Sequence, residues 1–468
     1  MKNTRKILAV LAVVIFPACS CVEKVPSHSQ PSESSQQDEI PVISDEVPEE
    51  EPFDISGQTI TWLADYDLNP SEGGERSVAL ALFEDVYGAK VDFVRTTADN
   101  KFTKLSEMLM SGEEVDMFPY EWDAVPNGVL KDQYQPLDDY FDIMGVEDGL
   151  WDDMTGVIDM FEYNNKHYVM PYDISNPVVI TYSRKLMKQE GFDDPYELYK
   201  KGEWDWNAMM SMMEKFVANS DGSVARYGIN GYIGSAVIQS TGSTVVNYRD
   251  GKFSNNIKDP NIENAGLFMQ ELAEKRLYSS LYVGHFPMDN STLFFSMGDW
   301  ALGTSNALNP DSDLMIVPFP KSPDADRNYL CCNFGARMLV KNSTKGEAVA
   351  AYMKCERIAA TQEEYKSAAK EKALLKKQTA TGTVEYFVTE EQYDALQSYL
   401  DTGNTVPMFD FAYGMGERMN GNGDYTYETR GVMNNLTDSI LDGTVESWAK
   451  LRDEWTGVID DVVKEFNK

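Results

Sequence analysis

The chain has 468 residues, more than one hydrophobic core usually organises, so we expect two lobes or domains. It carries 76 acidic against 41 basic residues, a formal net charge of −35. A field of that sign repels nucleic-acid phosphates and anionic lipid headgroups, so neither is an expected partner. Neutral or cationic ligands remain, and the 12% aromatic content suits a site with stacking surfaces.

The N-terminus has the pattern of an export signal. Lys2, Arg5 and Lys6 precede an apolar run at 7–16, which is too short to span a bilayer as a mature helix. No later apolar run is long enough to span a membrane, so we expect no permease activity in this chain.

Small residues precede two cysteines at the end of this run, in the sequence FPACSC. The arrangement resembles a bacterial lipobox, with Cys19 as the favoured diacylated residue and Cys21 as the alternative. We therefore expect a signal peptide at 1–18 and lipid anchoring on the extracellular face of the cell membrane. Residues 19–56 are rich in Ser, Gln, Glu and Pro, which is typical of a disordered tether.

The folded part opens with alternating strand and helix patterns. Strands are expected at 58–64, 90–95 and 115–119, and amphipathic helices at 77–87 and 102–110. Strands alternating with helices through short connections predict a parallel sheet covered on both faces.

A crossing between two lobes is expected at 164–187. A polar turn leads into a short apolar strand, the step Pro171-Tyr172-Asp173 interrupts it, and a second apolar run leads to an amphipathic helix. Pro171 restricts the backbone at this point, which favours a hinge here.

The rest of the chain continues the α/β pattern. Asp205 is a good N-cap for a helix at 206–217. Further strands are expected at 227–233, 251–255, 293–303, 314–320 and 333–340, and further helices at 262–277, 348–353, 390–400, 432–442 and 447–466.

Several of these segments together resemble extracellular solute-binding proteins, the receptors of ATP-driven sugar importers. The segments are KHYVMPY and YSRKL in the crossing, GEWDW at 202–206 and LFFSMGDW at 293–300. The resemblance implies an α/β, two-lobed periplasmic-binding-protein-like fold (type II), with mixed or parallel sheets and a ligand cleft between the lobes. It places one lobe at 57–173 with 328–385 and the other at 174–327 with 386–468.

Candidate ligand-binding residues follow the strands, because ligands of open α/β sheets sit beyond the carboxyl ends of strands. Aromatic rings suit the apolar faces of a sugar, and carboxylates and amides suit its hydroxyl edges. The candidates are Asp65, Tyr66, Tyr120, Glu121, Trp122, Tyr172, Asp173, Trp300 and Asn333.

The expected function is a monomeric, membrane-anchored receptor that closes on a mono- or oligosaccharide and delivers it to ABC permease subunits. The alternatives are an adhesin or sensor accessory lipoprotein, or a glycan-active enzyme. An enzyme would need paired carboxyls about 5 to 10 Å apart, for which Asp173 with Glu121 or Asp65 are candidates.

Neither a metal nor a cofactor is expected. The three histidines, His28, His167 and His285, show no zinc spacing, and Gly-rich phosphate motifs are missing. Export permits a disulfide between Cys355 and one of the adjacent Cys331 and Cys332, with buried reduced thiols as the alternative.

Overall fold

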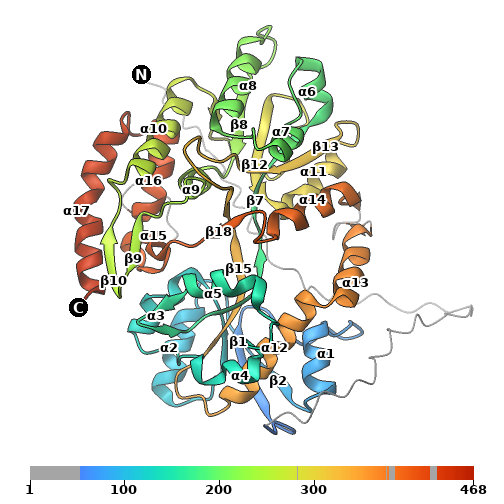
Figure 1. Cartoon of the computed structure of the whole chain (residues 1–468), viewed down its shortest axis with the longest axis vertical. Helices are drawn as coiled ribbons and strands as arrows, with labels where there is room; N and C mark the ends of the chain where they lie inside the picture. The colour runs from blue at the N-terminus through green and yellow to red at the C-terminus, as the bar shows by residue number, and fades with distance from the viewer. Residues whose placement is uncertain (1–52, 282, 376, 379–384, 422–428) are drawn as a thin grey trace, which may run out of the picture.

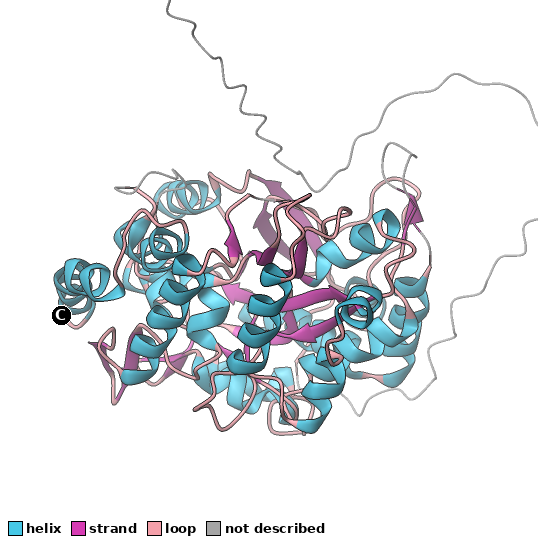
Figure 2. Ribbon diagram, turned by 90° about the horizontal axis from the view of Figure 1, so that it is seen from above, coloured by secondary structure: helices cyan, strands magenta, loops and turns pink. Residues whose placement is uncertain are grey.

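The computed structural model describes residues 53–281, 283–375, 377–378, 385–421 and 429–468. The predicted signal peptide, both candidate lipidation sites and most of the predicted tether lie outside these residues. Two five-stranded mixed sheets, each covered by helices, form the lower and upper lobes of Figure 1. Viewed from above in Figure 2, the strands run through the interior and helices surround them.

The lower lobe is built on the strand order β2-β1-β3-β15-β6. β1 pairs in parallel with β2 and β3, as predicted, whereas β15 runs antiparallel to β3 and β6. The bounds are β1 Thr59–Ala64, β2 Lys90–Arg95, β3 Met117–Pro119, β6 Met170–Ser175 and β15 Asn333–Leu339. The covering helices include α1 Val78–Asp85, α2 Lys101–Ser111, α4 Phe141–Met144, α5 Thr155–Met160 and α12 Gly346–Thr361.

The upper lobe has the strand order β11-β8-β12-β7-β13. Its strands are β7 Val178–Ser183, β8 Tyr227–Gly231, β11 Tyr278–Ser279, β12 Thr292–Gly298 and β13 Leu314–Pro318. Its helices include α6 Arg184–Glu190, α7 Pro195–Lys201, α8 Trp206–Ala218, α9 Gly234–Gln239, α10 Pro260–Glu274, α11 Leu302–Leu308 and α14 Glu390–Leu400. Asp205 caps α8 as predicted, because its side chain accepts a hydrogen bond from the Ala208 amide.

Smaller elements connect the lobes or extend them. They are α3 Asn127–Leu130, β4 Glu162–Tyr163, β5 Lys166–His167, β9 Val246–Arg249, β10 Lys252–Asn255, β14 Tyr329–Cys331, α13 Glu363–Leu374, β16 Lys377–Gln378, β17 Glu385–Tyr386 and β18 Val406–Met408. The C-terminal helices are α15 Glu417–Asn420, α16 Gly431–Leu441 and α17 Trp448–Phe466, and α16 packs on α10. The five short 3₁₀ helices are η1 Trp122–Ala124, η2 Asp138–Tyr140, η3 Asp152–Met154, η4 Asp299–Ala301 and η5 Phe411–Gly414.

The prediction that Pro171 interrupts the crossing strand is wrong. Pro171 lies inside β6 and pairs with Ala336 of β15. β6 is an edge strand, where a residue without an N–H is tolerated. The chain leaves the lower sheet two residues after Asp173 instead, at Asn176-Pro177, where Asn176 has φ 45° and the next strand belongs to the upper sheet.

Aromatic rings from both lobes pack against one another where the lobes meet. The Tyr163 ring of β4 lies 5.6 Å from Tyr248 and 5.7 Å from Phe253, both on the β9–β10 hairpin. Tyr248 and Phe253 in turn contact Phe411 of η5, at 5.2 and 5.4 Å. The Asn164 amide donates to the Tyr248 hydroxyl at 2.8 Å, so the turn after β4 is bound to this hairpin.

Three further features concern sequence expectations. Among the described residues, Cys331, Cys332 and Cys355 form no disulfide bond with one another, so the possible disulfide is absent. No helix in the described part of the chain combines the length and apolarity needed to cross a membrane. The lobe limits inferred from the resemblance remain predictions.

Replacing Tyr163 by Ala should lower the free energy of unfolding by about 3 kcal/mol, because the buried ring contacts the opposite lobe and its loss leaves a cavity. Chemical denaturation measures this. Tyr365→Ala, on the outer helix α13, is the control and should cost less than about 1 kcal/mol. Equal effects of the two variants would contradict the contact between lobes.

Candidate functional site

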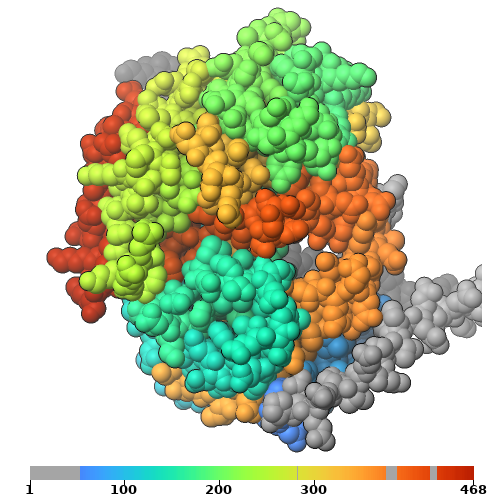
Figure 3. Space-filling model, in the orientation of Figure 1, coloured from blue at the N-terminus to red at the C-terminus, as the bar shows by residue number. Residues whose placement is uncertain are grey.

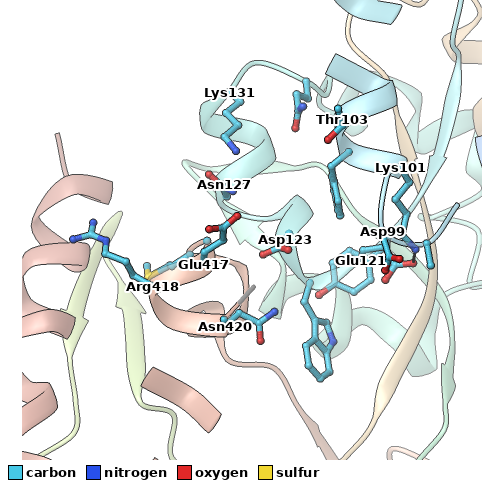
Figure 4. A pocket seen from close by; sticks show the side chains of 18 of the residues that line it. Asp99, Lys101, Thr103, Glu121, Asp123, Asn127, Lys131, Glu417, Arg418 and Asn420 are labelled. Carbon is cyan, nitrogen blue, oxygen red and sulfur yellow. Dashed lines mark hydrogen bonds and ion pairs between the residues drawn. The ribbon is translucent and has the colours of Figure 1, made fainter. Parts of the chain in front are cut away.

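A cleft of about 1290 Å³ lies between the lower sheet and the C-terminal helices. Its walls come from the start of α2, the segment 120–133, the crossing at Ser175 and Asn176, the start of β15, the segment 415–421, Arg430, Asn434 and the end of α17. The cleft therefore draws on residues from distant parts of the sequence, and Figure 4 shows side chains of the 99–131 region opposite those of Glu417, Arg418 and Asn420.

Four of the nine predicted site residues line this cleft: Tyr120, Glu121, Trp122 and Asn333. The first three follow β3 directly, and Asn333 begins the adjacent antiparallel strand β15. The structure thus brings these four residues together in one cleft, and their part in ligand binding stays a prediction. Trp122 is 41% exposed, and its ring lies 4.7 Å from that of Tyr413 in η5.

Glycine at position 414 permits this contact. A Cβ at Gly414 would lie 1.8 Å from the Val125 carbonyl oxygen and 2.5 Å from that of Trp122. Any larger residue would push η5 away from η1, so the close approach of these two backbones sets the position of Trp122.

Asp65 lies close to the cleft through an ion pair. Lys101, which is 7% exposed and lines the cleft, places its Nζ 2.5 Å from Glu121 and 3.7 Å from Asp65. One buried ammonium thus neutralises two predicted site carboxylates, one after β1 and one after β3. Lys101 itself was not among the predicted site residues. Its position at the start of a helix that faces two strand ends is typical of a cation that pairs with carboxylates there.

Tyr66, Tyr172 and Asp173 do not line the cleft. Tyr172 and Asp173 lie beside Gly335 of β15 instead, where Gly335 pairs with Asp173 of β6. Phe334 lines the cleft, whereas a Cβ at Gly335 would lie 2.0 Å from the Asp173 carboxylate and 2.9 Å from the Tyr172 ring.

These three residues surround a buried arginine instead. The guanidinium of Arg337 lies over the rings of Trp62 and Tyr172, at 5.0 and 5.1 Å, and donates to Glu356 at 2.7 Å. Tyr66 packs edge-on against Trp62 at 5.5 Å. The main role of this cluster in the structure is to hold β1, β6 and α12 together.

Trp300 stands apart from the others. It lies in η4 directly after β12 in the upper lobe, is 55% exposed and does not line the cleft. Its predicted part in ligand binding stays a prediction.

Several cleft residues were missed by the sequence reasoning. The C-terminal segment supplies Glu417, Arg418 and Asn420. Figure 4 shows the carboxylates of Glu417 and Asp123 on facing sides of the cleft. The sequence signal for this wall is Gly414-Met415-Gly416, whose first glycine permits the close approach of η5 to η1.

Several charged side chains of the cleft form ion pairs, whereas Asp123, which is half-buried, has no such partner among the described residues. Arg418 is ion-paired with Glu465, and Lys101 with Glu121. Asp123 has a buried Oδ1 without a hydrogen-bond partner among the described residues. Burial raises the pKa of Asp123, the charge of Lys131 lowers it, and Glu417 and Glu121 raise it further.

The described residues contain no group of three or more His, Cys, Asp or Glu side chains arranged to hold a metal ion. The polar groups of the cleft are instead hydroxyls, amides and carboxylates, including Thr103, Ser106, Asn127 and Asn420. Such groups donate and accept hydrogen bonds to neutral polyols.

Asp173 should make the stability of the protein depend on pH. Burial, and next the nearby Glu356, raise the pKa of its carboxyl to about 6, while an unfolded Asp titrates near 3.9. The folded state therefore holds this proton more tightly. The stabilisation of the folded state by this bound proton is complete below about pH 4 and is lost as the pH rises through 6.

Asp173→Asn should remove this loss, so the variant should be more stable than the wild type at pH 7 by up to about 3 kcal/mol. Thermal unfolding between pH 4 and 8 measures the difference. Asp92→Asn, at an exposed position of β2, is the control and should leave the pH profile of the wild type unchanged. An Asp173→Asn profile parallel to that of the wild type would contradict the assignment.

Comparison by sequence finds no relative: no protein-family model and no curated protein matches the chain. Comparison by structure finds many solved proteins of one kind. The sugar-binding protein MalE from Xanthomonas citri aligns with a TM-score of 0.61 at 14% identity, over 87% of this chain and 98% of its own. A sugar transporter protein from Rhizobium etli, in an open conformation, gives 0.61 at 14% identity, over 87% and 99%.

A third match carries a ligand. The ABC substrate-binding protein from Listeria monocytogenes in complex with cycloalternan aligns with a TM-score of 0.55 at 15% identity, over 87% of this chain and 98% of that protein. At such identities the likeness concerns the fold. The predicted fold class is confirmed: the chain has the two-lobed α/β fold of ABC transporter substrate-binding proteins.

Proposed function

We propose that this protein is the ligand-binding component of an ABC importer and that it binds a mono- or oligosaccharide in the cleft between its lobes. Two lines of support exist. Solved proteins of the same fold carry sugars, among them cycloalternan and lacto-N-biose. The cleft of this chain, with its hydroxyls, amides and carboxylates beside an exposed indole, has the chemistry that a sugar requires.

The observation that carries the proposal is the setting of Trp122. Its ring is held against Tyr413, is 41% exposed and lines the cleft. An apolar sugar face can stack on such a ring while the hydroxyl edges reach the side chains of Asn333, Asn420 and Asn127. The role is non-catalytic, since affinity alone serves transport.

The positions of Glu121 and Asp173, the candidate catalytic carboxylates, support a binding role. Glu121 is ion-paired to Lys101 and lines the cleft, whereas Asp173 does not line it. A glycosidase would need both carboxyls to reach one bond. The position of Asp173 outside the cleft therefore favours binding over hydrolysis.

Ligand capture would proceed by closure of the lobes about the crossing at Asn176-Pro177, after which the closed form docks on membrane permease subunits. The mature chain would be a monomer held at the extracellular face of the membrane by a lipid on Cys19. The support for this location is the composition of residues 1–56, which combine a signal pattern, a lipobox-like sequence and a polar tether.

Isothermal titration calorimetry against neutral mono- and oligosaccharides should find at least one ligand. For that saccharide, Trp122→Ala should weaken binding about tenfold, corresponding to ~1.4 kcal/mol, because the stacking surface is lost. Tyr196→Ala, on α7 and outside the cleft, is the matched control and should bind like the wild type. A protein that binds peptides or polyamines but no saccharide would refute the proposal.

Labelling with an alkyne fatty acid in a bacterial host tests the anchor. The wild-type chain should take up the label and fractionate with membranes, and Cys19→Ala should be released unlabelled. Cys21→Ala should behave like the wild type. The reverse pattern would move the anchor to Cys21, and labelling of neither form would refute lipidation.

A further inference from the structure

A second, much smaller cavity lies behind the wall that carries Trp122. Its volume is about 30 Å³, enough to hold one small polar group of the size of a water molecule. The lower lobe supplies Trp122 and Phe334, and the rest comes from α9 of the upper lobe, from Cys332 between β14 and β15, and from the segment 408–413. The lining residues are Trp122, Ser235, Gln239, Cys332, Phe334, Met408, Phe409, Asp410 and Tyr413.

Gln239, the last residue of α9, is the unusual member of this lining. It is 7% exposed, and its Oε1 has no hydrogen-bond partner among the described residues. Leaving a buried amide oxygen unpaired is costly, and buried polar groups in folded proteins almost always have a partner. The partner of Gln239 must therefore come from outside the described chain, through the cavity that it lines.

The cavity shares a wall with the large cleft. Trp122 and Phe334 line both. A hydroxymethyl group extends one carbon further from a sugar ring than a ring hydroxyl does, so it is the part of a sugar stacked on Trp122 that can reach beyond this shared wall.

We propose that this cavity is a side pocket of the cleft that receives the hydroxymethyl group of a saccharide, and that Gln239 is the residue that recognises its hydroxyl. The proposal rests on the saccharide-binding function and deepens it. It makes Gln239 a specificity-determining residue, which separates hexoses and hexose-built oligosaccharides from pentoses and 6-deoxy sugars.

The chemistry of the lining favours a neutral hydroxyl over other groups. A hydroxyl donates to the unpaired Oε1 and accepts from a donor such as the amide of the same side chain. A carboxylate is disfavoured, because its negative charge would face both Oε1 and the buried carboxyl of Asp410. That carboxyl already accepts hydrogen bonds from the amides of Val245, Val246 and Ala412. A methyl group would fill the space and leave Oε1 unpaired.

The test compares Gln239→Leu with the wild type on matched ligands. The probes are cellotriose, maltotriose and β-1,6-galactobiose, each with its 6-deoxy counterpart, and xylotriose as the form of cellotriose without hydroxymethyl groups. For whichever parent saccharide binds most tightly, the wild type should prefer the parent about tenfold or more over the 6-deoxy form. Gln239→Leu should weaken binding of the parent by a similar factor and leave binding of the 6-deoxy form within twofold.

A wild-type protein that binds parent and 6-deoxy forms equally would overturn the inference while the saccharide function stands. A preference for the parent saccharide that persists in Gln239→Leu would also overturn the inference. Binding of no saccharide at all would refute the function and the inference together, so the two failures are distinguishable.

Stability supplies a readout without ligand. Gln392 is also buried, but its side chain makes hydrogen bonds with Asn306, Thr389 and the Leu314 carbonyl. Gln392→Leu should therefore lower Tm by several degrees, whereas Gln239→Leu should leave Tm unchanged or raise it. A comparable loss in both variants would show that Gln239 already has a partner within the protein, which contradicts the proposal.

Discussion

The contact between η1 and η5 is the constraint on which the site depends. Gly414 allows the backbone of η5 to reach the carbonyls of Trp122 and Val125, and Tyr413 then packs on the Trp122 ring. Next to this contact, Phe409 lies 4.3 Å from Phe161 of the lower lobe and 4.8 Å from Phe411. A continuous set of aromatic rings thus joins the C-terminal segment to both lobes, and the cleft is the space left beside it. In the space-filling view of Figure 3, the orange-red C-terminal segment lies between the two lobes.

Two groups of residues in the lower lobe have different roles in this arrangement. In the first group, Arg337 between Trp62 and Tyr172 binds Glu356 of α12 and stabilises the lobe. In the second group, Phe334 and Trp122 form an apolar wall beside amides and carboxylates. The proposed side pocket behind that wall uses the same junction, since Gln239 of α9 and Tyr413 of η5 both line it together with Trp122.

Local sequence patterns predicted the elements and part of the site. The alternation of 58–64 and the spacing of the first helices predicted a parallel arrangement of β1, β2 and β3, and the strand-end rule located Tyr120, Glu121 and Trp122 in the cleft. Patterns could not predict contacts between distant segments. The insertion of β15 between β3 and β6 depends on pairing over more than 150 residues, and it places Asp173 beside Gly335, outside the cleft. Glu417 and Asn420 were missed for the same reason, and Pro171 was misjudged because edge and central strands look alike in sequence.

A crystal structure of the protein with the saccharide that binds most tightly tests the central claim most directly. The account predicts one sugar ring stacked on Trp122, hydrogen bonds from both the 120–133 segment and the 415–421 segment, and lobes closer together than in the unliganded protein. A saccharide bound on the outer surface of one lobe, with the cleft beside Trp122 empty, would contradict it.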